Sequence, residues 1–167
     1  MTWSITSDSN EAAKVRWDVA EFTRGFGLDI GCGPHKGYHH FVGVDNMKDT
    51  RIFGIYMDPD VKMEATNLAP YKDGGCDFVF SSHLLEHIVD HNQALKEWWR
   101  VVRVGGHLVL YLPHKDFYPN IGEYGANLDH KHDFLPQDIV DSMKDVGGWD
   151  LLVNEERDGG DEYSFLT

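Results

Sequence analysis

Residues 27–37 read Gly-Leu-Asp-Ile-Gly-Cys-Gly-Pro-His-Lys-Gly, and this stretch decides the fold that we expect. Its two apolar residues, Leu28 and Ile30, are typical of a short buried strand. Three glycines follow at the carboxyl end of that strand, where open α/β sheets bind ligands. Glycine adopts positive φ and lets the backbone approach a ligand closely. The stretch therefore predicts a strand that leads into a ligand-binding loop.

An acidic residue, Asp29, lies between the two apolar residues of this strand. Burying a carboxylate without a hydrogen-bond partner is costly. We therefore expect Asp29 to have a partner, and a cationic amine on a ligand would serve.

A second strand is predicted at residues 41–45, Phe-Val-Gly-Val-Asp. An acid at the end of the second strand hydrogen-bonds ribose hydroxyls in dinucleotide-binding folds, so Asp45 completes a mononucleotide half-site. The glycines are spaced Gly-x-Gly-x-x-x-Gly, and the acid follows Gly31 by 14 residues, where the nicotinamide fingerprint has about 20. A nicotinamide-binding oxidoreductase is thus an alternative that the spacing disfavours.

Four motifs in this order resemble those of class I S-adenosylmethionine-dependent methyltransferases, and of type 11-like members in particular. They are Leu-Asp-Ile-Gly-Cys-Gly at 28–33, Val-Gly-Val-Asp at 42–45, Asp-Phe-Val-Phe-Ser-Ser-His-Leu-Leu-Glu-His-Ile at 77–88, and Arg-Val-Val-Arg-Val-Gly-Gly-His-Leu-Val-Leu-Tyr-Leu-Pro at 100–113. The resemblance covers residues 25–167. It implies a Rossmann-like α/β sheet, mostly parallel with a C-terminal antiparallel hairpin, in a single domain over residues 1–167. It also implies S-adenosylmethionine as the cofactor.

The resemblance assigns cofactor-binding roles to nine residues. Glu64 and Ala65 occupy the place where the family's acid and the following backbone amide hold the adenine; otherwise Glu64 is an exposed acid at a strand end. The full set is Asp29, Gly31, Cys32, Gly33, Asp45, Glu64, Ala65, Ser82 and His83.

The first crossover departs from the usual pattern. Parallel strands normally need a connection of a dozen or more residues, usually a helix, whereas only residues 32–41 lie between the first two strands. We expect the first crossover helix to be cut to about one turn, which leaves one face of the sheet less covered.

Residues 1–24 form an N-terminal segment in which we expect a helix. Asp8 and Glu11 have capping-box spacing, and apolar residues recur at helical intervals, which predicts an amphipathic helix over residues 10–24 that covers the sheet or lids the cofactor. Residues 46–60 show no clean periodicity and are expected to be irregular with a helical turn.

The remaining elements follow from apolar runs and helix signals. Strands are expected at 61–66, 76–81 and 108–112, helices after Asp90 and from Pro136, and a closing hairpin at 150–156 and 162–167. The sequence ends inside the expected last strand, which would fit a truncated C terminus.

The composition limits the possible partners. The 167 residues carry a formal net charge of −13, which argues against a nucleic-acid acceptor because such affinity depends on Lys and Arg. We expect no membrane partner and a cytoplasmic protein, since no signal peptide or membrane-length apolar run is present. Cys32 and Cys76 show no pattern of a disulfide framework. The oligomeric state is left open.

His83, Glu86 and His87 fit His-x-x-Glu-His, the zinc motif of inverted zincins. That motif must lie within a helix, whereas His83 directly follows a strand, so a zinc hydrolase is the weaker alternative. A second metal group, His130 with His132 and nearby aspartates, is weaker than solvated loop residues. We therefore expect no metal.

Residues 113–136 follow the fifth strand, and a long loop of this kind in a compact domain is usually functional or disordered. Its aromatic and histidine residues favour an acceptor-binding loop. Since a histidine could serve as the base for a hydroxyl acceptor, the candidate catalytic residues are His114 and His87, followed by His130 and His132.

Adenine-methylating members of the family carry Asn or Asp followed by Pro-Pro and an aromatic residue after the fourth strand, whereas this chain has Ser-Ser-His-Leu at 81–84. The resemblance thus implies methyl transfer to a small-molecule or sugar acceptor, at oxygen or nitrogen. A catalytically silent cofactor-binding or partner-binding module remains the alternative.

Overall fold

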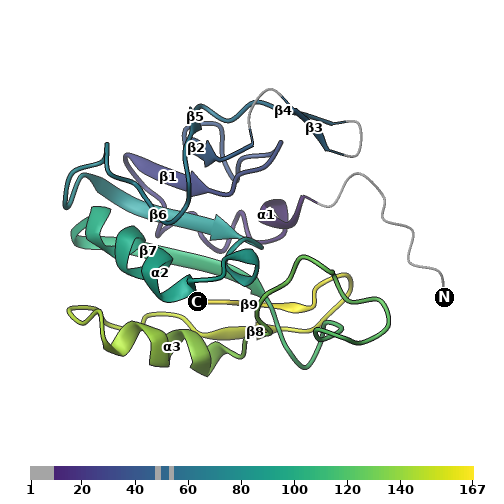
Figure 1. Cartoon of the computed structure of the whole chain (residues 1–167). Helices are drawn as coiled ribbons and strands as arrows, with labels where there is room; N and C mark the ends of the chain where they lie inside the picture. The colour runs from purple at the N-terminus through teal and green to yellow at the C-terminus, as the bar shows by residue number, and fades with distance from the viewer. Residues whose placement is uncertain (1–9, 48–49, 53–54) are drawn as a thin grey trace.

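The apolar strands assemble into one seven-stranded sheet in a computed structural model, which describes residues 10–47, 50–52 and 55–167. The strand order is β5-β2-β1-β6-β7-β9-β8 (Figure 1). The strands are β1 Gly27–Ile30, β2 Val42–Asp45, β5 Val61–Lys62, β6 Cys76–Ser82, β7 Val102–Pro113, β8 Glu155–Arg157 and β9 Ser164–Leu166.

The predicted sheet topology is confirmed. The neighbouring strands from β5 to β7 pair in parallel, whereas β9 pairs antiparallel with both β7 and β8. The predicted C-terminal hairpin is therefore present, with shorter strands. All four residues of β1 are buried between β2 and β6, so the glycine loop begins at the centre of the sheet.

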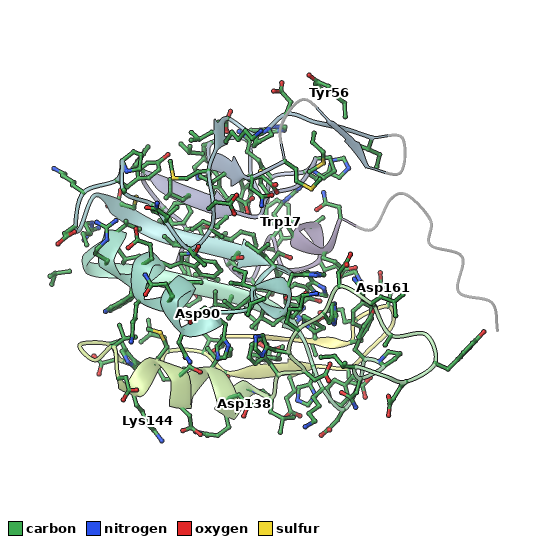
Figure 2. The ribbon with its side chains drawn as sticks, viewed as in Figure 1. Trp17, Tyr56, Asp90, Asp138, Lys144 and Asp161 are labelled. Carbon is green, nitrogen blue, oxygen red and sulfur yellow. The ribbon has the colours of Figure 1, made fainter. Side chains whose placement is uncertain are left out.

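One face of the sheet is covered by α2 (His91–Val101) and α3 (Pro136–Lys144). The side chain of Asp90 accepts a hydrogen bond of 3.0 Å from the Gln93 amide and so caps α2, as its sequence predicts. Pro136 begins α3, and Ile139 and Met143 are buried. Figure 2 labels Asp90 and Asp138, which lie at the starts of the two helices.

The opposite face is covered by the N-terminal segment, but the predicted helix over residues 10–24 is wrong in length. Helix α1 is Glu11–Lys14, and hydrogen-bonded turns follow it. Its N-cap is Asn10; the predicted cap Asp8 lies outside the described residues. Two β-branched valines and a tryptophan lower the helix propensity of residues 15–19, so packing decides the backbone there.

This segment takes the place of the missing crossover helix. Val15 and Val19 are buried in the same cluster as Phe78 and Phe80 of β6. The connection from β1 to β2 contains turns and no helix, so the one-turn helix expected there is absent. The apolar residues of the N-terminal segment therefore shield the face that the short crossover leaves bare.

Two predictions between β2 and β6 are corrected. The stretch expected to be irregular contains an antiparallel pair, β3 (Thr50–Ile52) with β4 (Ile55–Met57). Strand β5 has two residues, where the sequence predicts a strand over 61–66, because the chain turns back at Asn67, whose amide bonds to the carbonyl of Glu64. Within the described residues, no helix has the length and apolar character needed to cross a bilayer.

Candidate functional site

The carboxyl ends of β1, β2, β6 and β7 meet at one edge of the sheet, as parallel strands must. The glycine loop, the turn after β6 and the long loop after β7 all leave from this edge (Figure 1). A ligand in an open α/β sheet binds there.

The glycine loop adopts backbone angles that suit glycine. Gly31 has φ of 73° and Gly33 has φ of 55°. A Cβ atom on Gly31 would lie 2.5 Å from Leu84 Cδ2, so this glycine is required for packing. A Cβ atom on Gly33 would meet nothing closer than Met57 Cε at 4.0 Å. Gly33 thus leaves space beside the backbone where a ligand can approach.

The partner of Asp29 is supplied by the chain itself. Its Oδ2 accepts a hydrogen bond of 2.7 Å from the Gly37 amide. The expected need for a partner is correct, but a ligand amine is not required to meet it. Burial raises the pKa of the Asp29 carboxyl to about 7, and the Gly37 hydrogen bond and the charge of Lys36 oppose that rise. Asp29 therefore fixes the curvature of the glycine loop.

Asp45 joins the glycine loop to the segment that follows β2. Its Oδ2 accepts from the Gly33 amide at 3.1 Å, and its Oδ1 accepts from the Met47 amide at 2.8 Å. Each carboxylate oxygen can accept a second hydrogen bond, so both remain able to receive a ligand hydroxyl. The residue is half-buried, which leaves it accessible from the edge.

Glu64 and Ala65, which are predicted to hold the adenine, lie next to the end of β2. Glu64 is exposed, and its Oε2 accepts from Asn46 Nδ2 at 3.2 Å. The carbonyl of Ala65 accepts from Trp98 Nε1 at 2.7 Å, which anchors this turn to α2. The structure therefore brings Glu64 close to the end of β2.

A pocket of about 260 Å³ opens beside the glycine loop and is lined by Cys32, Gly33 and Arg16, among others. Burial raises the pKa of the Cys32 thiol to about 12, so Cys32 stays protonated and serves as a lining group. The open space at Gly33, the accessible acid at the end of β2 and this pocket fit a nucleoside cofactor.

Ser82 is the last residue of β6, and His83 follows it at the same edge. The Oγ of Ser82 is buried and has no hydrogen-bond partner among the described residues. His83 has φ of 51°, which is uncommon for a residue with a side chain, and its Nε2 lies 3.0 Å from Ser164 Oγ. Burial lowers the pKa of His83 to about 3, so its ring is neutral at pH 7.

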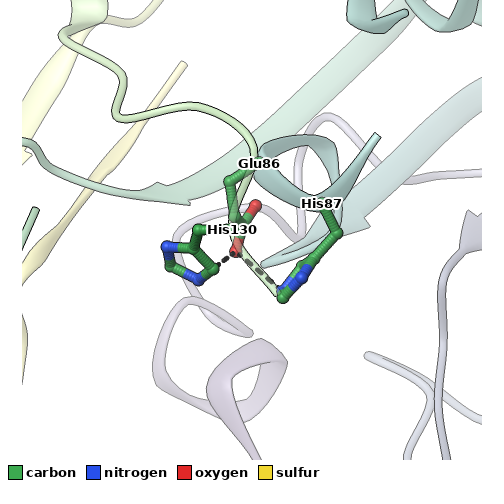
Figure 3. A group of neighbouring side chains, drawn as sticks. All are labelled: Glu86, His87 and His130. Atoms are coloured by element: carbon green, nitrogen blue, oxygen red, sulfur yellow. Dashed lines mark ion pairs between the residues drawn. The ribbon is translucent and has the colours of Figure 1, made fainter. Parts of the chain in front are cut away.

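Glu86 lies between two histidines from different segments (Figure 3). Its Oε1 is 3.8 Å from His87 Nε2 and 3.9 Å from His130 Nε2, and the two imidazole rings meet edge to face with centroids 4.8 Å apart. Burial raises the pKa of Glu86 to about 8 and lowers the pKa of His130 to about 4. Burial lowers the pKa of His87 as well, against the influence of the Asp129 backbone and charge.

The sequence drew attention to Glu86 and His87 but did not pair them with His130. The pairing depends on the loop after β7, which docks onto the turn after β6 because the amide of Lys131 donates to the Glu86 carbonyl at 2.7 Å. No local pattern signals such a long-range contact.

The other two candidate histidines, His114 and His132, are held by contacts within the protein. His114 is buried, its Nδ1 accepts from the Asp116 amide at 3.1 Å, and its ring stacks on Phe117 with centroids 4.1 Å apart. His132 Nε2 lies 3.0 Å from the carbonyl oxygen of Ile88. His132 does not belong to the group of possible metal ligands found among the described residues.

The inverted-zincin geometry is not formed. His83 precedes the helical turn, has a positive φ and lies outside the 3-10 turn Leu85–His87. The two histidines of that motif therefore do not sit one turn apart on a helix, as the zincin site requires.

Comparisons with known proteins agree with this geometry. A family model for a methyltransferase domain matches residues 28–110. A probable S-adenosylmethionine-dependent methyltransferase from Mycolicibacterium smegmatis is 26% identical over 135 residues, which cover 72% of this chain and 50% of that protein. An uncharacterized 37.1 kDa protein in transposon TN4556 of Streptomyces fradiae is 27% identical over 132 residues, or 68% of this chain and 38% of that protein. The chain spans half or less of the length of these curated relatives.

The fold is shared with solved structures. The crystal structure of a SAM dependent methyltransferase from Archaeoglobus fulgidus superposes with a TM-score of 0.63 and 22% identity, covering 82% of this chain and 67% of the other. The sheet and its carboxyl edge thus define a Rossmann-like nucleoside-binding domain. Residues 28–110 match the methyltransferase-domain family, and the fold is one that this chain shares with S-adenosylmethionine-dependent methyltransferases, which supports such an activity for it.

Proposed function

We propose that this domain transfers a methyl group from S-adenosylmethionine to a small-molecule or sugar acceptor, at oxygen or nitrogen. The observation that carries the proposal is the glycine loop joined to Asp45 through the Gly33 amide at the carboxyl edge of the sheet. That arrangement supports a nucleoside cofactor whose reactive end faces the loop after β7.

The cofactor would be held by residues of three segments. Gly31, Cys32 and Gly33 would cradle it, Asp45 would accept its ribose hydroxyls, and the turn at Glu64 would border its base. Bound S-adenosylmethionine supplies an activated methyl group on its sulfonium. The protein's main task is to hold the acceptor atom about 3 Å from that methyl group and to exclude water.

The acceptor would lie between the histidine cluster and the loop over residues 113–136. Of the two candidate bases, His87 and His114, His87 is the better one. Its side chain is 30% exposed, and its lowered pKa leaves the ring neutral and able to accept a proton. His114 would support the start of the loop. Exposed Ile121, Tyr124 and Leu128 offer the loop an apolar surface for an acceptor.

The first test measures binding of S-adenosylhomocysteine by titration calorimetry. We expect the wild type to bind and Asp45→Ala to lose affinity by about tenfold to a hundredfold, because hydrogen bonds to a charged group contribute about 1.5–3 kcal/mol. Asp158→Ala is the matched control, since Asp158 is an exposed acid in the turn between β8 and β9. Unchanged affinity in Asp45→Ala would remove Asp45 from the site.

A second measurement separates the enzyme from a silent binding module. Radiolabelled S-adenosylmethionine is offered with panels of hydroxylated and amine-bearing small molecules and sugars. Transfer of label supports the enzyme, whereas tight cofactor binding with no transfer across the panels would favour the silent module.

A further inference from the structure

A buried carboxylate without a hydrogen bond lies at the acceptor side of the site. Glu86 has a fully buried side chain, and neither of its carboxylate oxygens has a hydrogen-bond partner within residues 10–47, 50–52 and 55–167. A buried polar group left in this way is costly, and in native structures it has a reason such as a catalytic role, an ordered water or a bound ion. The oxygens of Glu86 are therefore available to bind a ligand.

The groups nearest to this carboxylate are histidine nitrogens. Ligand atoms of Glu86, His87 and His130 all lie within 4.8 Å of one another. The contacts of 3.8 and 3.9 Å are too long for hydrogen bonds but suit atoms that surround a common ion (Figure 3). His83 Nδ1 also faces Glu86 Oε1, at 3.9 Å.

The three ligands come from two segments that backbone hydrogen bonds join to each other. Glu86 and His87 belong to the 3-10 turn after β6, and His130 belongs to the loop after β7. Backbone hydrogen bonds from Lys131 and His132 to the Glu86 carbonyl fix the loop against that turn. A set of ligands fixed by such contacts needs little rearrangement to bind an ion.

We propose that Glu86, His87 and His130 form a binding site for a divalent transition-metal cation. Two imidazoles and one carboxylate suit zinc or iron, whereas calcium and magnesium prefer oxygen ligands. The site differs from the zincin motif, because His130 takes the place that His83 would have and Glu86 is a ligand.

Three protein ligands leave coordination positions open, as in catalytic metal sites. An oxygen of the acceptor, from a hydroxyl or a carboxylate, can fill one of them and so be held at the carboxyl edge. This role for the cation rests on the proposed methyl transfer, and with the cation bound His87 is a metal ligand and not a base; cation binding itself does not depend on the transfer.

The test is titration of chelator-treated protein with Zn²⁺ by calorimetry and with Co²⁺ by visible absorption. We expect one site per chain and a higher melting temperature in the presence of metal, since a ligand of the native state stabilises it. Glu86→Gln keeps the shape of the side chain but cannot ionise to become a carboxylate ligand. It should weaken binding more than about a hundredfold, because even outer partners of metal sites contribute about tenfold to a hundredfold.

His130→Gln is the second variant, and His39→Ala is the control, since His39 is exposed and lies before the amino end of β2. We expect weakened binding in His130→Gln and unchanged binding in His39→Ala. The cation site would be overturned if the wild type bound neither metal, or if Glu86→Gln and His130→Gln bound the metal as tightly as the wild type.

Titration with S-adenosylhomocysteine, with and without metal, separates the two proposals. Cofactor binding without metal binding would overturn the cation site and leave the methyltransferase proposal standing. Metal binding without cofactor binding would overturn the methyltransferase proposal and leave the cation site standing.

Discussion

Two buried acidic residues have different surroundings in this molecule. Asp29 and Glu86 are both almost inaccessible to solvent. Asp29 accepts a hydrogen bond from the Gly37 amide, and the chain therefore satisfies it. Glu86 has no such bond among the described residues, and its surroundings hold histidine nitrogens. The first acid shapes a loop, and the second is available to a ligand.

Asp29 should make stability depend on pH. Its folded-state pKa of about 7 lies above the ordinary value of 3.8, so between these values the folded state holds a proton that the unfolded state has released. The free energy of unfolding therefore falls as pH rises from about 4 to about 7. Asp29→Asn should remove up to about 4 kcal/mol of that fall, because one pKa unit corresponds to about 1.36 kcal/mol.

Urea unfolding of wild type and Asp29→Asn across this range measures the effect. The difference between the two proteins cancels the other titrating groups that both share. A difference that stays constant with pH would show that Asp29 has an ordinary pKa in the folded protein.

At the scale of elements, the N-terminal segment replaces a helix that the fold normally places between its first two strands. The segment also holds the glycine loop, because Arg16 Nε donates to the Gly37 carbonyl at 2.9 Å and Tyr38 Oη donates to the Arg16 carbonyl at 2.6 Å. One segment thus shields a sheet face and positions the ligand loop.

Substitutions on the buried side of this segment should lower the free energy of unfolding more than substitutions on its exposed side. Val15 is fully buried against β6, so Val15→Ala should lower the free energy of unfolding by about 1–3 kcal/mol. Trp17 is 82% exposed, and Trp17→Ala should change stability by less than about 0.5 kcal/mol. Equal effects of the two substitutions in urea unfolding would contradict the proposed packing.

The elements that sequence reasoning predicted well are those with strong local signals. Strand β1 has apolar residues and a glycine stop, and α2 has an N-cap and an apolar stripe. The length of α1 and the pairing of β3 with β4 depend on tertiary contacts, which local patterns do not report. For the same reason, Asp45 could be identified from its place after a strand, whereas the pairing of His130 with Glu86 could not.

At the scale of the whole molecule, acidic residues outnumber basic ones by 28 to 15. A net negative charge of this size repels phosphates. The sequence-based expectation that nucleic acid is not the acceptor rests on this charge.

Fluorescence anisotropy of labelled RNA and DNA oligonucleotides tests that expectation. We expect no binding at about 0.15 M salt, where non-specific contacts to phosphates are screened. A labelled anionic polysaccharide is the charge control. Binding to RNA or DNA that weakens steeply with salt would contradict the expectation and return nucleic acids to the set of possible acceptors.

The position of β9 between β7 and β8 has a consequence for the route of folding. Strands β8 and β9 are near in the chain and can pair early, whereas β9 joins β7 through contacts distant in sequence, including the two hydrogen bonds between Leu110 and Thr167. Non-local pairing of this kind forms slowly. Until the hairpin docks, β7 is an open edge strand, so this is the stage at which refolding chains are most exposed to aggregation.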